Sequence, residues 1–216
     1  MDSGQDQAGV FVSDHPVIAD KLARLRQSST PSPEFRRLIQ EISLLLGLEA
    51  TKDLKQQRKT IETPLMSTEV SALAEYPFLV PVLRAGLGMV EAMLQLIPEC
   101  IVGHVGLYRD HQSLKPVLYY SRLPQNLEGY LSIILDPMLA TGGTVSHTAS
   151  LLKARGAKRI SLISIVGAPE GIARMQADHP EVRIYLGALD QGLNDKGYIL
   201  PGLGDAGDRL YQTTTF

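Results

Sequence analysis

The feature that most constrains the fold is an alternation of short apolar runs with helical stretches, which extends over residues 78–186. The apolar runs are short and rich in Val, Ile and Leu, as buried strands are, whereas the intervening stretches have helical length. Strands that alternate with helices are joined by right-handed crossovers and form a mainly parallel sheet. The predicted strands cover residues 78–83, 100–108, 130–135, 160–166 and 182–186, and the predicted helices cover 89–96, 145–155 and 170–177.

The front of the chain has a different pattern. Residues 1–13 mix Gly, Gln and Asp without periodicity and are expected to be frayed. Apolar residues then recur at helical intervals, so residues 14–60 are interpreted as a helical lead-in to the sheet. The chain has 216 residues, and we interpret 1–216 as a single α/β domain.

Composition excludes several classes of protein. A hydrophobic share of 44% supports a core without disulfides, and the single cysteine, Cys100, has no partner within the chain. The net charge of −2 gives no general attraction to nucleic acid or anionic membrane. The sequence shows no signal peptide and no apolar run of about 18 residues. We therefore expect a cytoplasmic protein without nucleic-acid or membrane partners.

The strongest local signal is the segment 131–144, where a predicted strand ends in Asp136 and a Thr-Gly-Gly-Thr turn begins a helix. The two glycines of the turn permit positive φ values and a close approach of backbone to ligand. Consecutive N–H groups and the helix N-terminus form a cradle for an anion, to which Thr141 and Thr144 add hydroxyls. The pattern favours a monophosphate over an ordinary strand–turn–helix junction, and it is neither a Walker loop nor a dinucleotide fingerprint.

Two arginines follow other predicted strands. Arg84 lies in a Gly-rich turn after 78–83, and Arg109 follows 100–108. Because ligands bind at the carboxyl ends of parallel strands, both can converge on a diphosphate and neutralise it. A surface position is the alternative for Arg84. The segment after Arg109 is either a mobile flap that excludes water or an ordinary hairpin.

The Gly-rich segment 197–208 near the C-terminus is predicted to bind a flat heterocycle. Such glycine density is typical of a tail, but the apolar residues 198–200 and the following Pro201 indicate a fixed turn. Backbone N–H and C=O groups can match the two carbonyls and the N3–H of uracil, with Ile199 over one face. Asp205 is then expected near the reacting nitrogen or the ribose.

These segments together resemble the uracil phosphoribosyltransferase family from about His15 to the C-terminus. The matching motifs occur in the family's order: Phe35-Arg-Arg-Leu, Val80–Gly88, Gly103–Asp110, Asp136–Thr144, Ala168–Ile172 and Gly197–Arg209. The resemblance implies a type I phosphoribosyltransferase fold, a mainly parallel twisted sheet flanked by helices with a small hood. It implies pyrimidine salvage, in which uracil and phosphoribosyl diphosphate give UMP and diphosphate with Mg²⁺.

The resemblance also implies residue roles. Arg84 and Arg109 bind diphosphate, and Arg109 and Asp205 act in catalysis. Uracil is read by Ile199, Gly204, Asp205 and Ala206. The ribose 5-phosphate is held by Asp205 and by the nine residues Asp136, Pro137, Met138, Leu139, Ala140, Thr141, Gly142, Gly143 and Thr144.

Two departures from the wider pattern matter. Many phosphoribosyltransferases have two adjacent acids before the Gly turn, but here Pro137 follows Asp136, as in the uracil branch. We therefore expect Mg²⁺ to be bound mainly through the substrate and name no protein ligand. In the flap, Lys115 and Leu118 replace expected glutamates. The family also implies a homodimer or larger homo-oligomer, and GTP activates some members, for which no site is assigned here.

Three rival interpretations stay open at this point. One is a regulatory protein on the same fold that binds nucleotide or RNA with little catalysis. Another is a phosphoribosyltransferase for a different base. The third, a dinucleotide-dependent dehydrogenase, lacks its fingerprint in this sequence.

Overall fold

The computed structural model describes residues 5–7, 9–109 and 116–213. Its central sheet has the order β1-β2-β12-β11-β9-β5-β7-β8, with β6 beside β5 and β10 beside β11. The strands of this sheet are β1 (Gln5–Gln7), β2 (Val10–Val12), β5 (Phe78–Leu83), β6 (Ile101–Val102), β7 (His104–Arg109), β8 (Pro116–Arg122), β9 (Leu131–Leu135), β10 (Met138–Leu139), β11 (Arg159–Gly167) and β12 (Arg183–Leu189).

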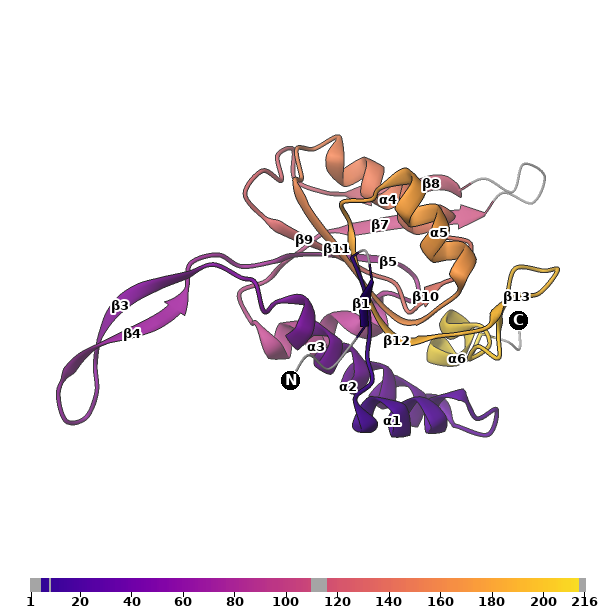
Figure 1. The fold of residues 1–216 in the computed structure, drawn as a ribbon, viewed down its shortest axis with the longest axis horizontal. Coiled ribbons are helices and arrows are strands. Elements are labelled where there is room, and N and C mark those ends of the chain that lie inside the picture. Colours follow the sequence, from indigo (N-terminus) through magenta and orange to yellow (C-terminus); the bar gives the residue numbers. More distant parts are fainter. Residues whose placement is uncertain (1–4, 8, 110–115, 214–216) are drawn as a thin grey trace.

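Helices cover both faces of this sheet (Figure 1). On one side lie α4 (Gly143–Lys153) and α5 (Pro169–Asp178), and on the other lie α1 (Pro16–Arg26), α2 (Ser32–Ala50) and α3 (Leu87–Leu96). Beyond one end of the sheet, the pair β13 (Gly192–Leu193) and β14 (Ile199–Leu200) stands beside α6 (Ala206–Tyr211). This last group is the predicted hood.

The parallel core forms where the sequence is mostly apolar, with buried serines at Ser132, Ser161 and Ser164. The central strands β5, β9 and β11 are buried along almost their whole length, which suits strands covered on both faces. They pair in parallel, with Val80 opposite Ile134 and Leu162 opposite the same residue. The predicted mainly parallel sheet with flanking helices is therefore confirmed.

The lead-in helices are amphipathic and dock on this core. In α2, Phe35, Leu38, Ile39, Ile42 and Leu46 recur at helical spacing, and each is fully buried. They pack in one cluster with Leu79 of β5 and Ile163 of β11. The helical prediction for the front of the chain is thus confirmed as far as Ala50.

Two predictions for the front of the chain are wrong. Within residues 1–13, β2 extends the sheet in parallel with β12, where Val10 lies opposite Ile184. This strand is only three residues long, so its own sequence carries too little alternation to be read, and the paired edge of β12 is what orders it. Residues 56–60, predicted as part of the helical lead-in, instead belong to a strand.

That strand is β3 (Gln56–Glu62), which pairs with β4 (Ser67–Leu73) in an antiparallel hairpin. Figure 1 shows the hairpin extending away from the body of the molecule. Most of β3 is exposed, so burial supplies no apolar periodicity from which the strand can be recognised.

The segment after β7 returns as β8 in an antiparallel pair, with Val105 opposite Ser121. The hairpin alternative therefore describes the two strands. Residues 110–115, including Lys115, lie outside the described part, while Leu118 is exposed on β8. In the ranges that the structure covers, no helix is both long and apolar enough to cross a membrane.

Candidate active site

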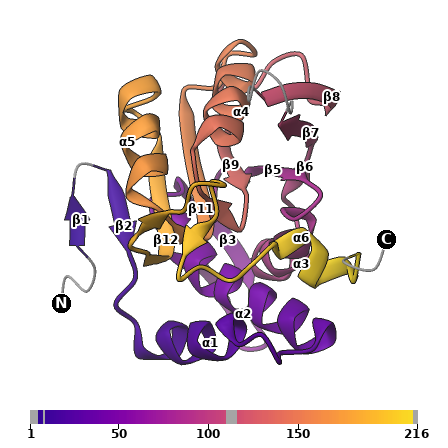
Figure 2. The same cartoon turned by 90° about the vertical axis from the view of Figure 1, so that its right-hand side faces the viewer.

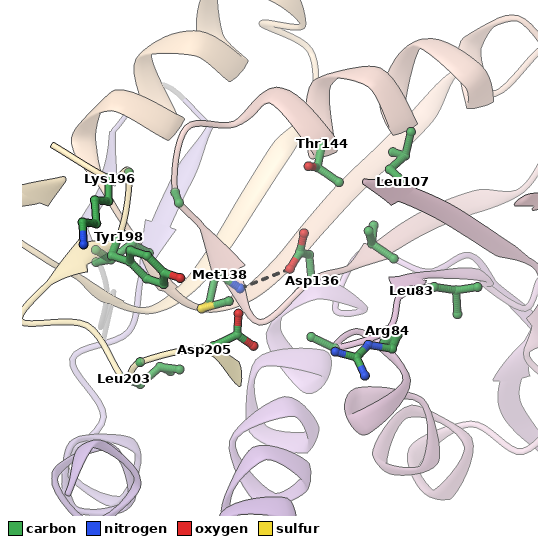
Figure 3. A pocket seen from close by; sticks show the side chains of 16 residues that line it. Leu83, Arg84, Leu107, Asp136, Met138, Thr144, Lys196, Tyr198, Leu203 and Asp205 are labelled. Atoms are coloured by element: carbon green, nitrogen blue, oxygen red, sulfur yellow. Dashed lines mark hydrogen bonds between the residues drawn. The ribbon is translucent and has the colours of Figure 1, made fainter. Parts of the chain in front are cut away.

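A cavity of about 730 Å³ lies at the carboxyl ends of the parallel strands, under the hood. Its walls come from four segments that are far apart in sequence: the end of β5 with the turn after it, Leu107 of β7, the segment after β9, and the hood (Figure 3). We call the third segment, Asp136–Thr144, the Gly142 loop, and the hood segment Ile199–Ala206 the Gly204 turn. Figure 2 looks toward this end of the molecule, with the yellow hood segment in front of the strands.

Arg84 lies in the tight turn between β5 and α3 and lines the cavity. The turn needs a glycine at position 86, because a Cβ there would lie 2.2 Å from the carbonyl oxygen of Leu135. One guanidinium nitrogen of Arg84 lies 3.4 Å from a carboxylate oxygen of Asp208 in α6. Since both side chains are partly exposed, this pair is weak and leaves the cation available to an anion in the cavity.

Asp136 ends β9 and faces the cavity (Figure 3). Its backbone is held in place because its carbonyl accepts a hydrogen bond of 2.6 Å from the Ser164 hydroxyl on β11. Burial raises the pKa of the Asp136 carboxyl to about 7, against the weaker lowering effect of a 3.3 Å hydrogen bond from the Met138 N–H. A carboxylate with few partners is ready to accept hydrogen bonds from ligand hydroxyls.

The Gly142 loop leads into the N-terminus of α4. Gly142 has φ +73°, and a Cβ on it would lie 2.9 Å from the carbonyl oxygen of Gly171 in α5. The loop therefore packs so closely on α5 that only glycine fits without strain. The first N–H groups of α4 have no partner within the helix and can bind an anion.

The nine predicted residues of the Gly142 loop divide into three sets. Asp136, Met138, Ala140 and Thr144 line the cavity, whereas Pro137 and Leu139 are buried away from it. The Pro137 carbonyl accepts hydrogen bonds from two N–H groups of β11, so this residue anchors the loop to the sheet. Thr141, Gly142 and Gly143 are not among the residues that line the cavity, and they form the turn that leads into α4.

The Gly204 turn closes the cavity from the hood. Ile199, Gly204 and Asp205 line the cavity, while Ala206 is fully buried and begins α6. The Asp205 carboxylate caps α6 by accepting a 2.8 Å hydrogen bond from the Asp208 N–H. This contact orients the side chain with one of its oxygens free of that bond.

Arg109 is the predicted residue that the structure places least completely. Its backbone ends β7, two residues beyond the cavity-lining Leu107, and β7 runs parallel to β5. Its side chain is not among the described ones, so its convergence with Arg84 on a diphosphate stays a prediction.

Several cavity residues had no individual role assigned from the sequence. Lys196, Gly197, Tyr198 and Leu203 belong to the hood, and Val82, Leu83, Ala85 and Leu107 belong to strand ends and the following turn. Each of them lies one to three positions along the chain from a predicted site residue. Closeness to a predicted motif was therefore the signal that could have identified them. Tyr198 and Lys196 add an aromatic ring and a cation to the hood side of the cavity (Figure 3).

Comparison with known proteins agrees with this geometry. The family model described as uracil phosphoribosyltransferase matches residues 12–213. A uracil phosphoribosyltransferase from Shouchella clausii is 52% identical over 94% of this chain and 98% of its own length. One from Thermoanaerobacter sp. (strain X514) is 49% identical with the same coverage.

Solved structures share the fold of this chain. A protein from Aquifex aeolicus superposes with a TM-score of 0.91 at 38% identity, covering 96% of this chain and 100% of that one. A hypoxanthine-guanine phosphoribosyltransferase from Bacillus anthracis has a TM-score of 0.51 at 12% identity, over 74% of this chain and 80% of its own. The second match shows a shared fold alone. From the family model and the close relatives, the chain belongs to the uracil phosphoribosyltransferase family.

Proposed function

We propose that this protein transfers the phosphoribosyl group of phosphoribosyl diphosphate to N1 of uracil, giving UMP and diphosphate in pyrimidine salvage. The observation that carries the proposal is the convergence of Arg84, the Gly142 loop and the Gly204 turn on one cavity. These three segments supply a cation for diphosphate, an amide cradle for the 5-phosphate and a backbone turn for the base. The close relatives carry the name of this activity.

In this mechanism the C1–O bond to diphosphate breaks while N1 of uracil bonds to C1 from the opposite face. Diphosphate departs with the bonding electron pair, and the N1 proton passes from the base to the departing diphosphate or to solvent water. Fixing the two reactants supplies up to about 7–11 kcal/mol in favourable cases. Arg84 and Arg109 stabilise the departing charge, and the Asp205 carboxylate faces the positive charge that develops on the sugar.

The Gly142 loop holds the other end of the sugar phosphate. The N–H groups of residues 141–144 bind the 5-phosphate, and the Thr144 hydroxyl, which lines the cavity, adds a donor. The Asp136 carboxylate accepts hydrogen bonds from the ribose hydroxyls, which requires its ionised form. Met138 and Ala140 close the wall between the two sites.

Mg²⁺ fits this site as a companion of the substrate. Among the described residues, no three His, Cys, Asp or Glu side chains gather into a metal-binding group. The cavity offers the carboxylates of Asp136 and Asp205, and Mg²⁺ is commonly held by one or two carboxylates together with substrate phosphates. When bound, the ion would neutralise diphosphate charge.

Three further features of the family stay predictions for this chain. They are assembly into a homodimer or a larger homo-oligomer, activation by GTP, and a cytoplasmic location. None of the residue roles above depends on them.

The test is release of diphosphate from phosphoribosyl diphosphate with uracil, cytosine, hypoxanthine or orotate supplied in parallel. We expect release with uracil, together with stoichiometric UMP. Release with a different base alone would contradict the proposed substrate. An RNA-binding assay beside it decides against the regulatory alternative if UMP forms and RNA does not bind.

A further inference from the structure

We propose that Arg26, at the end of α1, is a positioning residue for the Gly204 turn and acts through the buried carboxylate of Asp190. The inference rests on the proposed function, since it concerns how the uracil site is held. It assigns a role in substrate recognition to a helix that lies outside the cavity.

Arg26 and Asp190 form a bidentate pair. One guanidinium nitrogen of Arg26 donates to Asp190 Oδ2 at 2.7 Å and the other donates to Oδ1 at 2.6 Å. The Asp190 side chain is 4% exposed and that of Arg26 is 21% exposed. A planar pair of this kind fixes orientation as well as distance, and its burial protects it from screening by salt.

This pair holds both backbone polar groups of Gly202. The Gly202 carbonyl accepts a 2.7 Å hydrogen bond from Arg26 Nη1, and the Gly202 N–H donates to Asp190 Oδ2 at 2.9 Å. The two peptide planes that flank Gly202 are therefore set by side chains from α1 and from the end of β12.

A second arginine holds the next residue. Arg209 of α6 donates to the Leu203 carbonyl at 2.8 Å and to the carbonyl of Gln27, the residue after Arg26, at 2.6 Å. Its guanidinium also lies 4.2 Å from the centre of the Phe35 ring in α2. Consecutive carbonyls of the turn are thus tied to the lead-in helices.

The turn needs such anchors for a physical reason. Gly202 and Gly204 have φ of +64° and +78°, so the chain here follows a path that no helix or strand stabilises. Uracil recognition by backbone groups requires each N–H and C=O to point at its partner on the base. Because a site that hydrogen-bonds its substrate discriminates strongly, a small rotation of these peptides costs recognition of the base but leaves the sugar phosphate site intact.

The experiment compares binding of UMP with binding of ribose 5-phosphate by calorimetry, in full-length wild type, Arg26→Met, Arg26→Lys and Asp190→Asn. Arg24→Met is the matched control, since Arg24 lies on the same helix but pairs at the surface with Glu34. For Arg26→Met we expect UMP affinity to fall about tenfold, as suits loss of hydrogen bonds to a charged group. Ribose 5-phosphate affinity should be unchanged, and Arg26→Lys should recover part of the loss.

Each outcome decides the matter. Unchanged UMP affinity in folded Arg26→Met, or an equal fall for UMP and ribose 5-phosphate, would overturn the proposal. If Arg26→Met does not fold, Arg26→Lys and Asp190→Asn are judged by the same two affinities. A wild type that binds UMP no more tightly than ribose 5-phosphate would instead sink the proposed function, and the positioning role with it.

Discussion

The Gly142 loop and the Gly204 turn face each other across one cavity, but they are built in different ways. The Gly142 loop runs directly from a buried strand into a helix, and its anchors are the neighbouring β11 and α5. The Gly204 turn has only short elements on either side, and its anchors come from α1, α6 and the end of β12. One wall of the cavity is therefore built from local structure, and the other from elements at both ends of the chain.

This difference in anchoring indicates how the Gly142 loop and the Gly204 turn each respond to mutation. A phosphate cradle made of consecutive amides is damaged by a local change in backbone. A turn held by arginines of other elements is also disturbed by mutations in those elements. Mutations in the Gly142 loop should alter the binding of phosphoribosyl diphosphate. Mutations in the Gly204 turn should instead alter the binding of uracil.

The largest effect is expected when the Gly142 loop is broken by Gly142→Val. A β-branched residue at φ +73°, with a Cβ 2.9 Å from the Gly171 carbonyl, displaces the loop amides. Backbone strain of about 1–3 kcal/mol and lost charge-assisted hydrogen bonds should lower kcat/KM for phosphoribosyl diphosphate about 10³-fold. The control is Gly129→Val, at φ +90° with open space around it. Wild-type kcat/KM in a folded Gly142→Val protein would contradict the phosphate role.

The Gly204 turn is tested by Gly202→Ala. A Cβ at this position would lie 2.2 Å from the Ile199 carbonyl, and φ is +64°. Strain of about 1–3 kcal/mol should appear mainly as a rise in the KM for uracil, about 10²-fold at most. The KM for phosphoribosyl diphosphate should be unchanged. If steady-state kinetics show an equal rise in the KM values for uracil and for phosphoribosyl diphosphate, the Gly204 turn and the Gly142 loop do not act separately.

A smaller effect, on stability, is expected from Asp136→Asn. Burial raises the pKa of Asp136 to about 7, so between pH 4 and pH 7 the folded protein retains a proton that the unfolded chain releases. Stability of the wild type should therefore fall as pH rises through this window, while the Asn variant lacks this loss. We expect the variant's relative free energy of unfolding to increase by about 3 kcal/mol from pH 4.5 to pH 8 in urea titrations. If the difference in free energy of unfolding between variant and wild type does not vary with pH, the pKa of the Asp136 carboxyl is not raised.

The smallest effect is expected from Asp205→Asn, which tests chemistry rather than architecture. Asparagine is as good a helix cap as aspartate, so α6 and the turn should persist. Loss of the negative charge beside the sugar should lower kcat about tenfold, which corresponds to about 1.4 kcal/mol. Calorimetric affinity for phosphoribosyl diphosphate should change little. If affinity and turnover fall equally, Asp205 acts in binding.

Much of the fold follows from local pattern. The apolar run 78–83 coincides with β5, and 160–166 lies within β11, because strands buried on both faces carry mostly apolar side chains on both sides. The hairpin β3–β4 and the edge strand β2 were missed because their order depends on pairing and not on burial. Within the site, a local motif identifies Asp136 from the sequence. Lys196 and Leu203, in contrast, line the cavity because of the path that the hood takes in the folded chain.

The sequence by itself determined the class of fold and the family to which the chain belongs, and it predicted the anion cradle. Each of these depends on patterns among residues close together along the chain. An example is segment 131–144, with its strand, carboxylate, two glycines and helix. Only the tertiary structure decided that Arg26 and Arg209 hold the Gly204 turn, and that Pro137 and Leu139 anchor the Gly142 loop instead of lining the cavity. The reason is that hydrogen bonds across 176 residues depend on where the packed core places the two partners, and no local pattern records that distance.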